Sequence, residues 1–252
     1  MPIRSSANWP SCRAASRPLA ALFLCWLHAC ASAPPAPPSS PEPEGLPWEV
    51  PASAIGTQQL FRMSYSGPRG EGSFRLALKI ESAARYQVSA ADPLGRALWS
   101  LDVTAGRGLF LDHRAHAACP LDGALSLVGA PLDRIELSDL PKLLLGRVPV
   151  TPSETTIAEA AEEIDLAGSA GEVWKVKLLH GRPVRWTLLR TGERAASWAT
   201  EQGEAVLSDR AGGKLRWRAS VAEPLGGALV PLKVPADYAS GGCPALKLGE
   251  GR

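Results

Sequence analysis

The sequence lacks the short motifs that commonly mark enzyme active sites. It has no G-x-S-x-G elbow, no H-E-x-x-H, no P-loop and no dinucleotide fingerprint, so the usual patterns for acyl transfer, metal-dependent hydrolysis and phosphate binding are missing. A dense basic run is missing too, because the lysines and arginines are spread over alternating positions typical of solvated strand faces. We therefore predict no enzyme, no cofactor and no nucleic-acid partner.

The N-terminal region lacks a hydrophobic run long enough to cross a bilayer. The apolar run at residues 19–29 falls short of the roughly 20 residues that span a hydrocarbon core of about 30 Å. Three arginines and no acidic residue precede it, an arrangement typical of a secretory signal peptide. Removing residues 1–29 takes away those three charges, so the formal net charge falls from +2 to −1.

The apolar run ends in Leu27-His28-Ala29-Cys30, which resembles the lipobox of a bacterial lipoprotein. We expect cleavage before Cys30 and acylation of its thiol, since several acyl chains on one cysteine give a stable membrane anchor. A lipobox ending at Cys25 and ordinary cleavage after Ala31-Ser32-Ala33 are the alternatives. Ala31 rather than aspartate after the modified cysteine favours the periplasmic face of the outer membrane.

The rest of the chain divides into a tether and one domain. Residues 31–51 contain eight prolines, which indicates an extended tether over residues 30–54. Residues 55–252 are enough for one single-core domain. Its two cysteines, Cys119 and Cys243, favour one disulfide in an oxidising compartment, and two separate thiols are the alternative.

Alternating hydrophobicity predicts strands through most of this domain. Residues 74–81 alternate apolar and mostly charged side chains, the period of a half-buried strand. Similar runs, separated by glycine and proline turns, occur from residue 61 to 111 and from 174 to 221. The prediction is a mainly β fold, with a curved antiparallel sheet or a half-open β-barrel.

The period changes between the two blocks of strands. Leu137, Leu140, Leu143 and Leu144 precede Gly146 at helical spacing, with Ser138 or Asp139 as the capping residue. A second helical spacing joins Ile157, Ala160, Ala161 and Ile164 and ends at Gly168. We expect these two short helices to form a lid over the concave face of the sheet.

Asp112 and His113, together with His116 and Cys119, are the chain's one candidate metal cluster. Histidine and cysteine are zinc ligands. Three-residue spacing on an extended chain, however, turns the side chains to opposite faces, and a disulfide would remove Cys119. We therefore predict no metal site.

The order of these segments resembles the LolB and LolA type of lipoprotein-binding proteins over most of residues 55–240. The most specific local element is Asp92-Pro93-Leu94-Gly95-Arg96, which resembles the protruding Pro-Leu-Gly loop of LolB. The resemblance implies a half-open barrel that holds acyl chains of other lipoproteins, with Leu94 touching the membrane. A plain hairpin turn whose leucine packs locally is the alternative.

Two hypotheses follow. The first is an outer-membrane-anchored lipoprotein whose hydrophobic cavity binds acyl chains or acylated lipoproteins and helps to localise them. Its candidate cavity residues come from the apolar strand faces: Phe74, Leu76, Leu78, Trp99, Leu101, Trp186 and Trp217. The second is a non-catalytic accessory lipoprotein that holds a protein partner in an envelope assembly.

Overall fold

The computed structural model describes residues 45–68, 70–128, 131–150, 162–168, 171–220, 222–241 and 246–247. All of these belong to one compact unit, Pro41–Arg252. The predicted signal peptide, Cys30, most of the predicted tether and Cys243 lie outside the described residues. Within the described part of the chain, no helix is both long and apolar enough to span a membrane.

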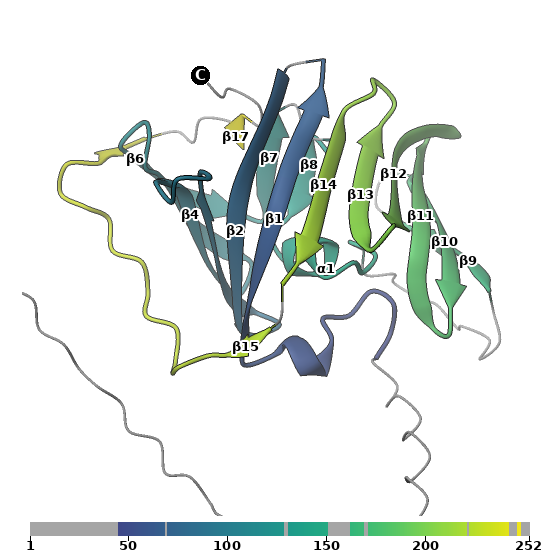
Figure 1. Ribbon diagram of the computed structural model, residues 1–252, viewed down its shortest axis with the longest axis horizontal. Helices are drawn as coiled ribbons and strands as arrows, with labels where there is room; N and C mark the ends of the chain where they lie inside the picture. The colour runs from purple at the N-terminus through teal and green to yellow at the C-terminus, as the bar shows by residue number, and fades with distance from the viewer. Residues whose placement is uncertain are drawn as a thin grey trace, which may run out of the picture. The chain divides into compact units, whose positions relative to one another are not determined.

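One large antiparallel sheet dominates the fold, and two meanders build it (Figure 1). The strands of the first meander are β1 (Thr57–Gly67), β2 (Gly70–Ser82), β3 (Arg85–Ala91), β4 (Ala97–Thr104), β5 (Arg107–Asp112) and β6 (Ala117–Asp122). Those of the second are β9 (Glu163–Ala167), β10 (Val173–Leu179), β11 (Arg182–Arg190), β12 (Glu193–Glu201), β13 (Glu204–Asp209) and β14 (Lys214–Ala219). The predicted strand-rich fold is confirmed.

Antiparallel pairing of β1 with β14 joins the two meanders into a continuous sheet. The short β15 (Glu223–Pro224) also pairs with β1, and β16 (Ala239–Ser240) lies parallel to β6 at one edge of the sheet. The opposite edge is β9, and the two edge strands do not pair with each other. The sheet is therefore strongly curved but open, as a half-open barrel requires.

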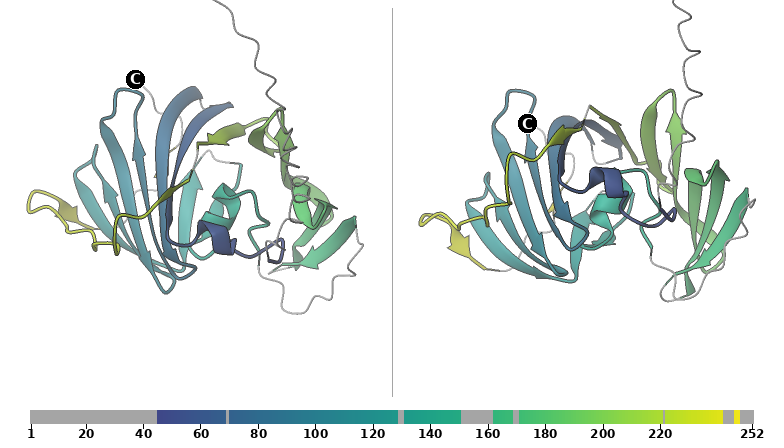
Figure 2. Two further views of the ribbon diagram at one scale, coloured as in Figure 1. Left: turned by 60° about the horizontal axis from the view of Figure 1, so that its bottom comes forward. Right: turned by 90° about the horizontal axis from the view of Figure 1, so that it is seen from below.

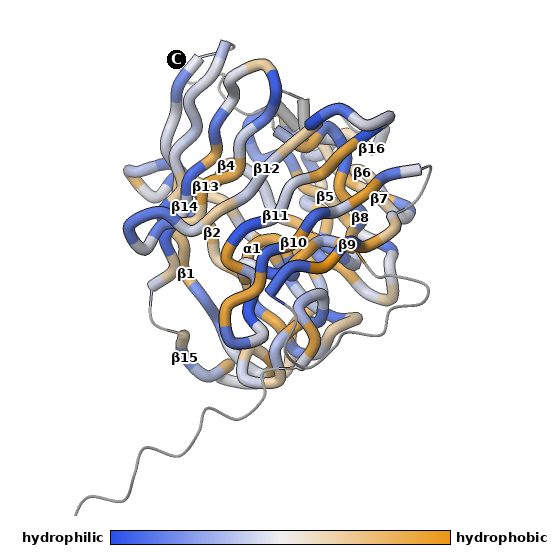
Figure 3. Tube along the Cα trace, turned by 90° about the vertical axis from the view of Figure 1, so that its right-hand side faces the viewer, coloured by the Kyte–Doolittle hydropathy of each residue, from blue (hydrophilic) through white to orange (hydrophobic). Residues whose placement is uncertain are grey.

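Period-two patterning gives the sheet one apolar face. Along β1, Phe61, Met63 and Tyr65 are buried while the residues between them are exposed, and Figure 3 shows the same alternation of orange and blue along β10 and β11. The buried side chains of both meanders form a single core cluster. We call the face that carries them the inner face and the opposite one the outer face.

A small insertion packs against the inner face (Figures 1 and 2). It consists of β7 (Ala124–Val128) and β8 (Arg134–Glu136), which form a second sheet with β17 (Leu246–Lys247), and of helix α1 (Leu140–Leu144). The four leucines at residues 137, 140, 143 and 144 are all buried. The first predicted helix is thus confirmed, although Asp139 at its N-cap makes no side-chain capping bond.

Two hydrogen bonds hold the insertion to the sheet. The hydroxyl of Tyr86 on β3 donates to the carbonyl oxygen of Leu137, and the indole Nε1 of Trp217 on β14 donates to that of Leu144. Burial raises the pKa of Tyr86 far above its ordinary value, and the nearby charge of Asp139 raises it further. Tyr86 therefore stays a neutral donor.

The second predicted helix is wrong where the structure describes it. Ile164 lies in strand β9, opposite Val176 of β10, and Leu166 is fully buried beside Trp174. Pairing with the edge of β10 gives the backbone of this segment its hydrogen bonds and buries Leu166. This tertiary pairing overrides the weak helical spacing of the apolar residues. Residues 157, 160 and 161 of that prediction lie outside the described residues.

Beyond β15 the chain crosses the strands of the first meander before it reaches β6, and we call residues 225–241 the strap (Figure 2, yellow). The backbone N–H of Leu232 donates to Oδ2 of Asp102 at 2.8 Å, and Asp102 also pairs with Arg85. At the far end of the strap, the Tyr238 hydroxyl lies 2.7 Å from Nδ1 of His113. The strap thus fastens the C-terminal part of the domain to the first meander.

Candidate functional site

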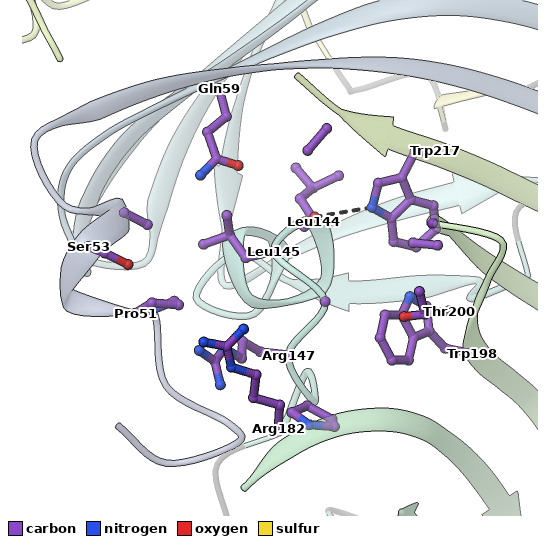
Figure 4. A pocket seen from close by; sticks show the side chains of 16 residues that line it. Pro51, Ser53, Gln59, Leu144, Leu145, Arg147, Arg182, Trp198, Thr200 and Trp217 are labelled. Atoms are coloured by element: carbon purple, nitrogen blue, oxygen red, sulfur yellow. Dashed lines mark hydrogen bonds between the residues drawn. The ribbon is translucent and has the colours of Figure 1, made fainter. Parts of the chain in front are cut away.

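A pocket of about 370 Å³ opens where α1 meets the second meander (Figure 4). Its walls come from three parts of the chain: residues 51–59, the end of α1 and the turn after it, and strands β11–β14. The apolar lining includes Leu144, Trp198, Trp217 and Ala205. The pocket therefore lies between α1 and the second meander.

The turn after α1 sets the shape of the pocket floor. Gly146 has a φ of +73°, and a Cβ added there would lie 3.1 Å from Cζ2 of Trp198. Both the positive φ and the close approach favour glycine. Trp198 and Trp217 both line the pocket, although each is only 3% exposed.

Polar groups also line the same pocket, and one of them, Arg147, is buried at 4% exposure. Gln59 and Thr200 contribute side chains from β1 and β12, and Arg147 and Arg182 bring two guanidinium groups to the wall. Figure 4 places the two arginines on the side of the pocket away from Trp217. Such a combination of apolar and polar lining residues fits an amphiphilic ligand.

The predicted cavity residues divide into two groups. Trp217 lines the pocket, whereas the other six are absent from its lining. Four of them lie in the packed core at 4% exposure or less: Leu76, Leu78, Leu101 and Trp186. Phe74 and Trp99 are partly buried and pack against that core. Sequence reasoning missed Arg147 and Arg182, which no local motif marks, and it identified Gly146 only as the end of a helix.

The Leu94 loop, residues 92–96, joins β3 to β4 and presents its leucine to solvent. Leu94 is 81% exposed, the highest value among the large apolar side chains described. Oδ1 of Asp92 accepts hydrogen bonds from the backbone N–H groups of Leu94 and Arg96, both at 2.9 Å. Oδ2 pairs with Nε of Arg96 at 2.5 Å.

These contacts hold the Leu94 loop in one shape. Desolvation acts to raise the pKa of the Asp92 carboxyl, but the bonds from Arg96, its charge and the bond from Leu94 together lower it. The loop is therefore ordered by an ionised carboxylate, and its leucine does not pack locally.

The residues of the candidate metal cluster are not brought together. His113 lies between Ser100 and Tyr238, with its ring nitrogens 2.9 and 2.7 Å from their hydroxyls. His116 pairs instead with Asp237 at 3.0 Å, and Cys119 is buried at 1% exposure. Among the described residues, no group of three or more His, Cys, Asp or Glu side chains could hold a metal ion.

No protein-family model and no curated protein matches the sequence. Solved structures do match it. A LolA superfamily protein from Nitrosomonas europaea is 10% identical with a TM-score of 0.50, covering 71% of this chain and 90% of that one. A putative outer membrane lipoprotein-sorting protein domain from Vibrio parahaemolyticus is 9% identical with a TM-score of 0.47, covering 70% and 90%. A DUF1329 family protein from Desulfovibrio piger is 10% identical with a TM-score of 0.45, again covering 70% and 90%.

At 10% identity the likeness to the Nitrosomonas protein concerns the fold. The described domain has the LolA-like fold, an open curved sheet whose inner face receives a short helix. The resemblance that the sequence suggests is thus confirmed at the level of architecture.

Proposed function

We propose that this chain binds acyl chains, either of a lipid or of an acylated lipoprotein, in the pocket between α1 and the second meander. One observation carries the proposal: the pocket is lined by two indoles and by polar side chains, and it lies between α1 and the curved sheet of a LolA-like fold. Removing an acyl chain from water contributes about 0.8 kcal/mol per buried methylene. Such binding needs no catalytic residue.

The packing of the inner face limits where on the sheet an acyl chain can bind. Helix α1 and the β7–β8 sheet fill much of that face with leucine side chains. The acyl chain is therefore assigned to the end of the sheet near Trp198 and Trp217, and entry of a long chain would displace α1.

The Leu94 loop supports a membrane-contacting step in the same function. A large apolar side chain that is 81% exposed on a hydrogen-bonded loop has nothing in its own domain to cover it. We propose that Leu94 enters the acyl region of a bilayer when the domain delivers or collects its ligand.

Anchoring and location complete the proposal. Cys30 would carry the acyl anchor after removal of residues 1–29, and the chain would act at the periplasmic face of the outer membrane. Metabolic labelling with palmitate should mark the wild-type chain and not Cys30→Ser, and membrane fractionation should then find the labelled chain in the outer membrane. Labelling of the variant, or an inner-membrane location, would contradict this part.

We also propose that Cys119 pairs with Cys243. Cys119 lies on β6 and is buried at 1% exposure, and Cys243 lies outside the described residues. Ala239–Ser240 runs parallel to Ala117–Ala118, and the N–H of Gly241 donates to the Ala118 carbonyl at 3.4 Å. The chain therefore passes beside β6 two residues before Cys243.

Binding is tested directly on the full chain isolated from its membrane. Mass spectrometry of the purified protein should detect a bound lipid or acylated lipoprotein, and a fluorescent fatty acid added to delipidated protein should quench its tryptophan emission. Displacement of the probe by unlabelled fatty acid is the expected result. Absence of saturable binding, together with absence of a copurified acyl ligand, would overturn the proposal.

A further inference from the structure

Four arginines from three neighbouring strands meet on the outer face of the sheet. Arg62 of β1 lies directly opposite Arg75 of β2 on one side and Arg218 of β14 on the other. Arg216, two residues before Arg218, lies on the same face. We call these four residues the arginine cluster.

The alternation of the strands fixes the direction of these side chains. Phe61, Met63 and Trp217 are buried toward α1, so their neighbours in the sequence point outward, and all four arginines are exposed. The Cα atoms of directly opposed residues on antiparallel strands lie about 4.5–5.5 Å apart. The backbone register therefore places Arg75, Arg62 and Arg218 side by side in one row.

Among the described residues, no carboxylate forms an ion pair with the arginine cluster. None of the ion pairs given by the described side chains includes any of its four members. Glu71 and Glu204 share this face, and the register of β13 with β14 brings Glu204 opposite Arg218, but neither carboxylate forms an ion pair with the four arginines. The four positive charges of the arginine cluster therefore stand against one directly opposed negative charge. Like charges directly opposite each other destabilise a sheet, so this arrangement favours an external anion.

The arginine cluster adjoins the Leu94 loop. Arg75 pairs with Ala91, the last residue of β3, and the loop begins at the next residue. An exposed leucine and a row of guanidinium groups thus lie at neighbouring positions. The strap makes its hydrogen bonds at other positions of the sheet, to Glu81, Asp102 and His113. All four arginines remain exposed.

We propose that the arginine cluster docks the domain on an anionic lipid surface, with the guanidinium groups on lipid phosphates while Leu94 enters the acyl layer. Guanidinium groups bind phosphate oxygens in bidentate fashion. An acidic protein would satisfy the arginines but would leave Leu94 without an apolar environment, whereas a bilayer offers both. The proposal rests on the membrane-contacting step proposed for Leu94 and adds the lipid class and the contacting face.

Vesicle binding by the full chain tests the proposal. Sedimentation is compared between vesicles of phosphatidylcholine alone and vesicles of phosphatidylcholine mixed with phosphatidylglycerol. Whatever the N-terminus contributes to binding is the same in every variant. We expect stronger binding to the anionic vesicles and loss of that difference at high salt, because the Debye length falls to about 3 Å at 1 M.

A matched pair of double variants locates the effect. Arg62→Gln with Arg75→Gln should weaken binding to the anionic vesicles by about fivefold per arginine, and leave binding to neutral vesicles unchanged. Lys177→Gln with Arg185→Gln removes the same charge from the outer face of β10 and β11, and should change binding far less.

Three outcomes would overturn the proposal: equal binding to both kinds of vesicle, equal losses in the two double variants, or a stoichiometric acidic protein bound through the arginine cluster in place of lipid. Two further measurements test the membrane contact of Leu94 and the binding of ligand in the pocket independently of the arginine cluster. Leu94→Ser should weaken binding to both kinds of vesicle, and fatty-acid binding in the pocket is measured without any vesicle.

Discussion

The indole Nε1 of Trp217 donates a hydrogen bond to the carbonyl oxygen of Leu144 at 3.1 Å, and both residues line the pocket. The donor lies on the strand that joins the two meanders, and the acceptor ends the only α-helix among the described residues. This bond couples the position of the lid to the sheet.

Trp217→Phe should destabilise the domain by about 1–3 kcal/mol, because it leaves the buried Leu144 carbonyl without its donor. Urea unfolding followed by circular dichroism measures the loss. Trp99→Phe is the control, since Trp99 is partly exposed and packs on Phe110. Equal losses in the two variants would mean that lost ring area, and not the hydrogen bond, sets the effect.

Tyr86 makes stability sensitive to alkaline pH. Its pKa is raised in the folded state, so its contribution is complete below the ordinary tyrosine pKa of 10.0 and is lost as pH rises above that value. Tyr86→Phe should lower stability at neutral pH by about 1–3 kcal/mol and should flatten the decline above pH 10.0. Urea midpoints at a series of pH values test this, and parallel pH profiles would refute it.

Filling the pocket should block ligand binding. Ala205 on β13 lines it, so Ala205→Phe places a ring between Trp217 and the end of α1. We expect fatty-acid affinity to fall by about tenfold or more, which corresponds to about 1.4 kcal/mol. Ala199→Phe adds the same ring to the outer face of β12 and should leave the affinity unchanged. Undiminished binding by the Ala205 variant would move the acyl site elsewhere.

Asp92 should control the order of the Leu94 loop without controlling the fold. Asp92→Ala removes the acceptor for two backbone N–H groups and the partner of Arg96, so hydrogen exchange at residues 94 and 96 should accelerate while the unfolding midpoint changes little. Since the pKa of Asp92 is lowered in the folded state, the wild-type loop should stay ordered until the pH falls through that lowered value. Unchanged exchange would show that the turn alone fixes the loop.

The predicted disulfide should tie the end of the chain to the middle of the domain. Peptide mapping without reduction should recover Cys119 joined to Cys243. Closing a loop of this length stabilises by about 4 kcal/mol in the chain-entropy model, so Cys119→Ser and Cys243→Ser should lower stability equally, and the double variant by no more. Pairing of Cys119 with any other cysteine would contradict the assignment.

Much of the fold follows from local patterns in the sequence. Alternation in residues 74–81 gives strand β2, and the leucine spacing before Gly146 gives α1, because a single face of each element is buried. The exposed Leu94 loop is also foreseeable from its turn residues. Each of these features depends on residues close together in the chain.

Features that depend on distant residues could not be predicted in this way. The sequence shows Arg62, Arg75, Arg216 and Arg218 as alternating charges typical of solvated strands, and only the pairing of β1 with β14 gathers them on one face. The pocket likewise needs Gly146 beside Trp198, far apart in the sequence. The sequence predicts a helix at Ile164 because the neighbouring residues do not reveal that this segment pairs with the edge of β10.

The same pairing governs when the domain can fold. Phe61 of β1 lies opposite Ala219 of β14, so the first strand lacks its second neighbour until most of the chain has been synthesised or exported. Contacts this far apart in sequence make folding slow, and an unpaired strand edge is open to pairing with other chains in the meantime. We expect chains that stop before residue 214 to aggregate through β1, and full-length chains to need protection of that edge until β14 arrives.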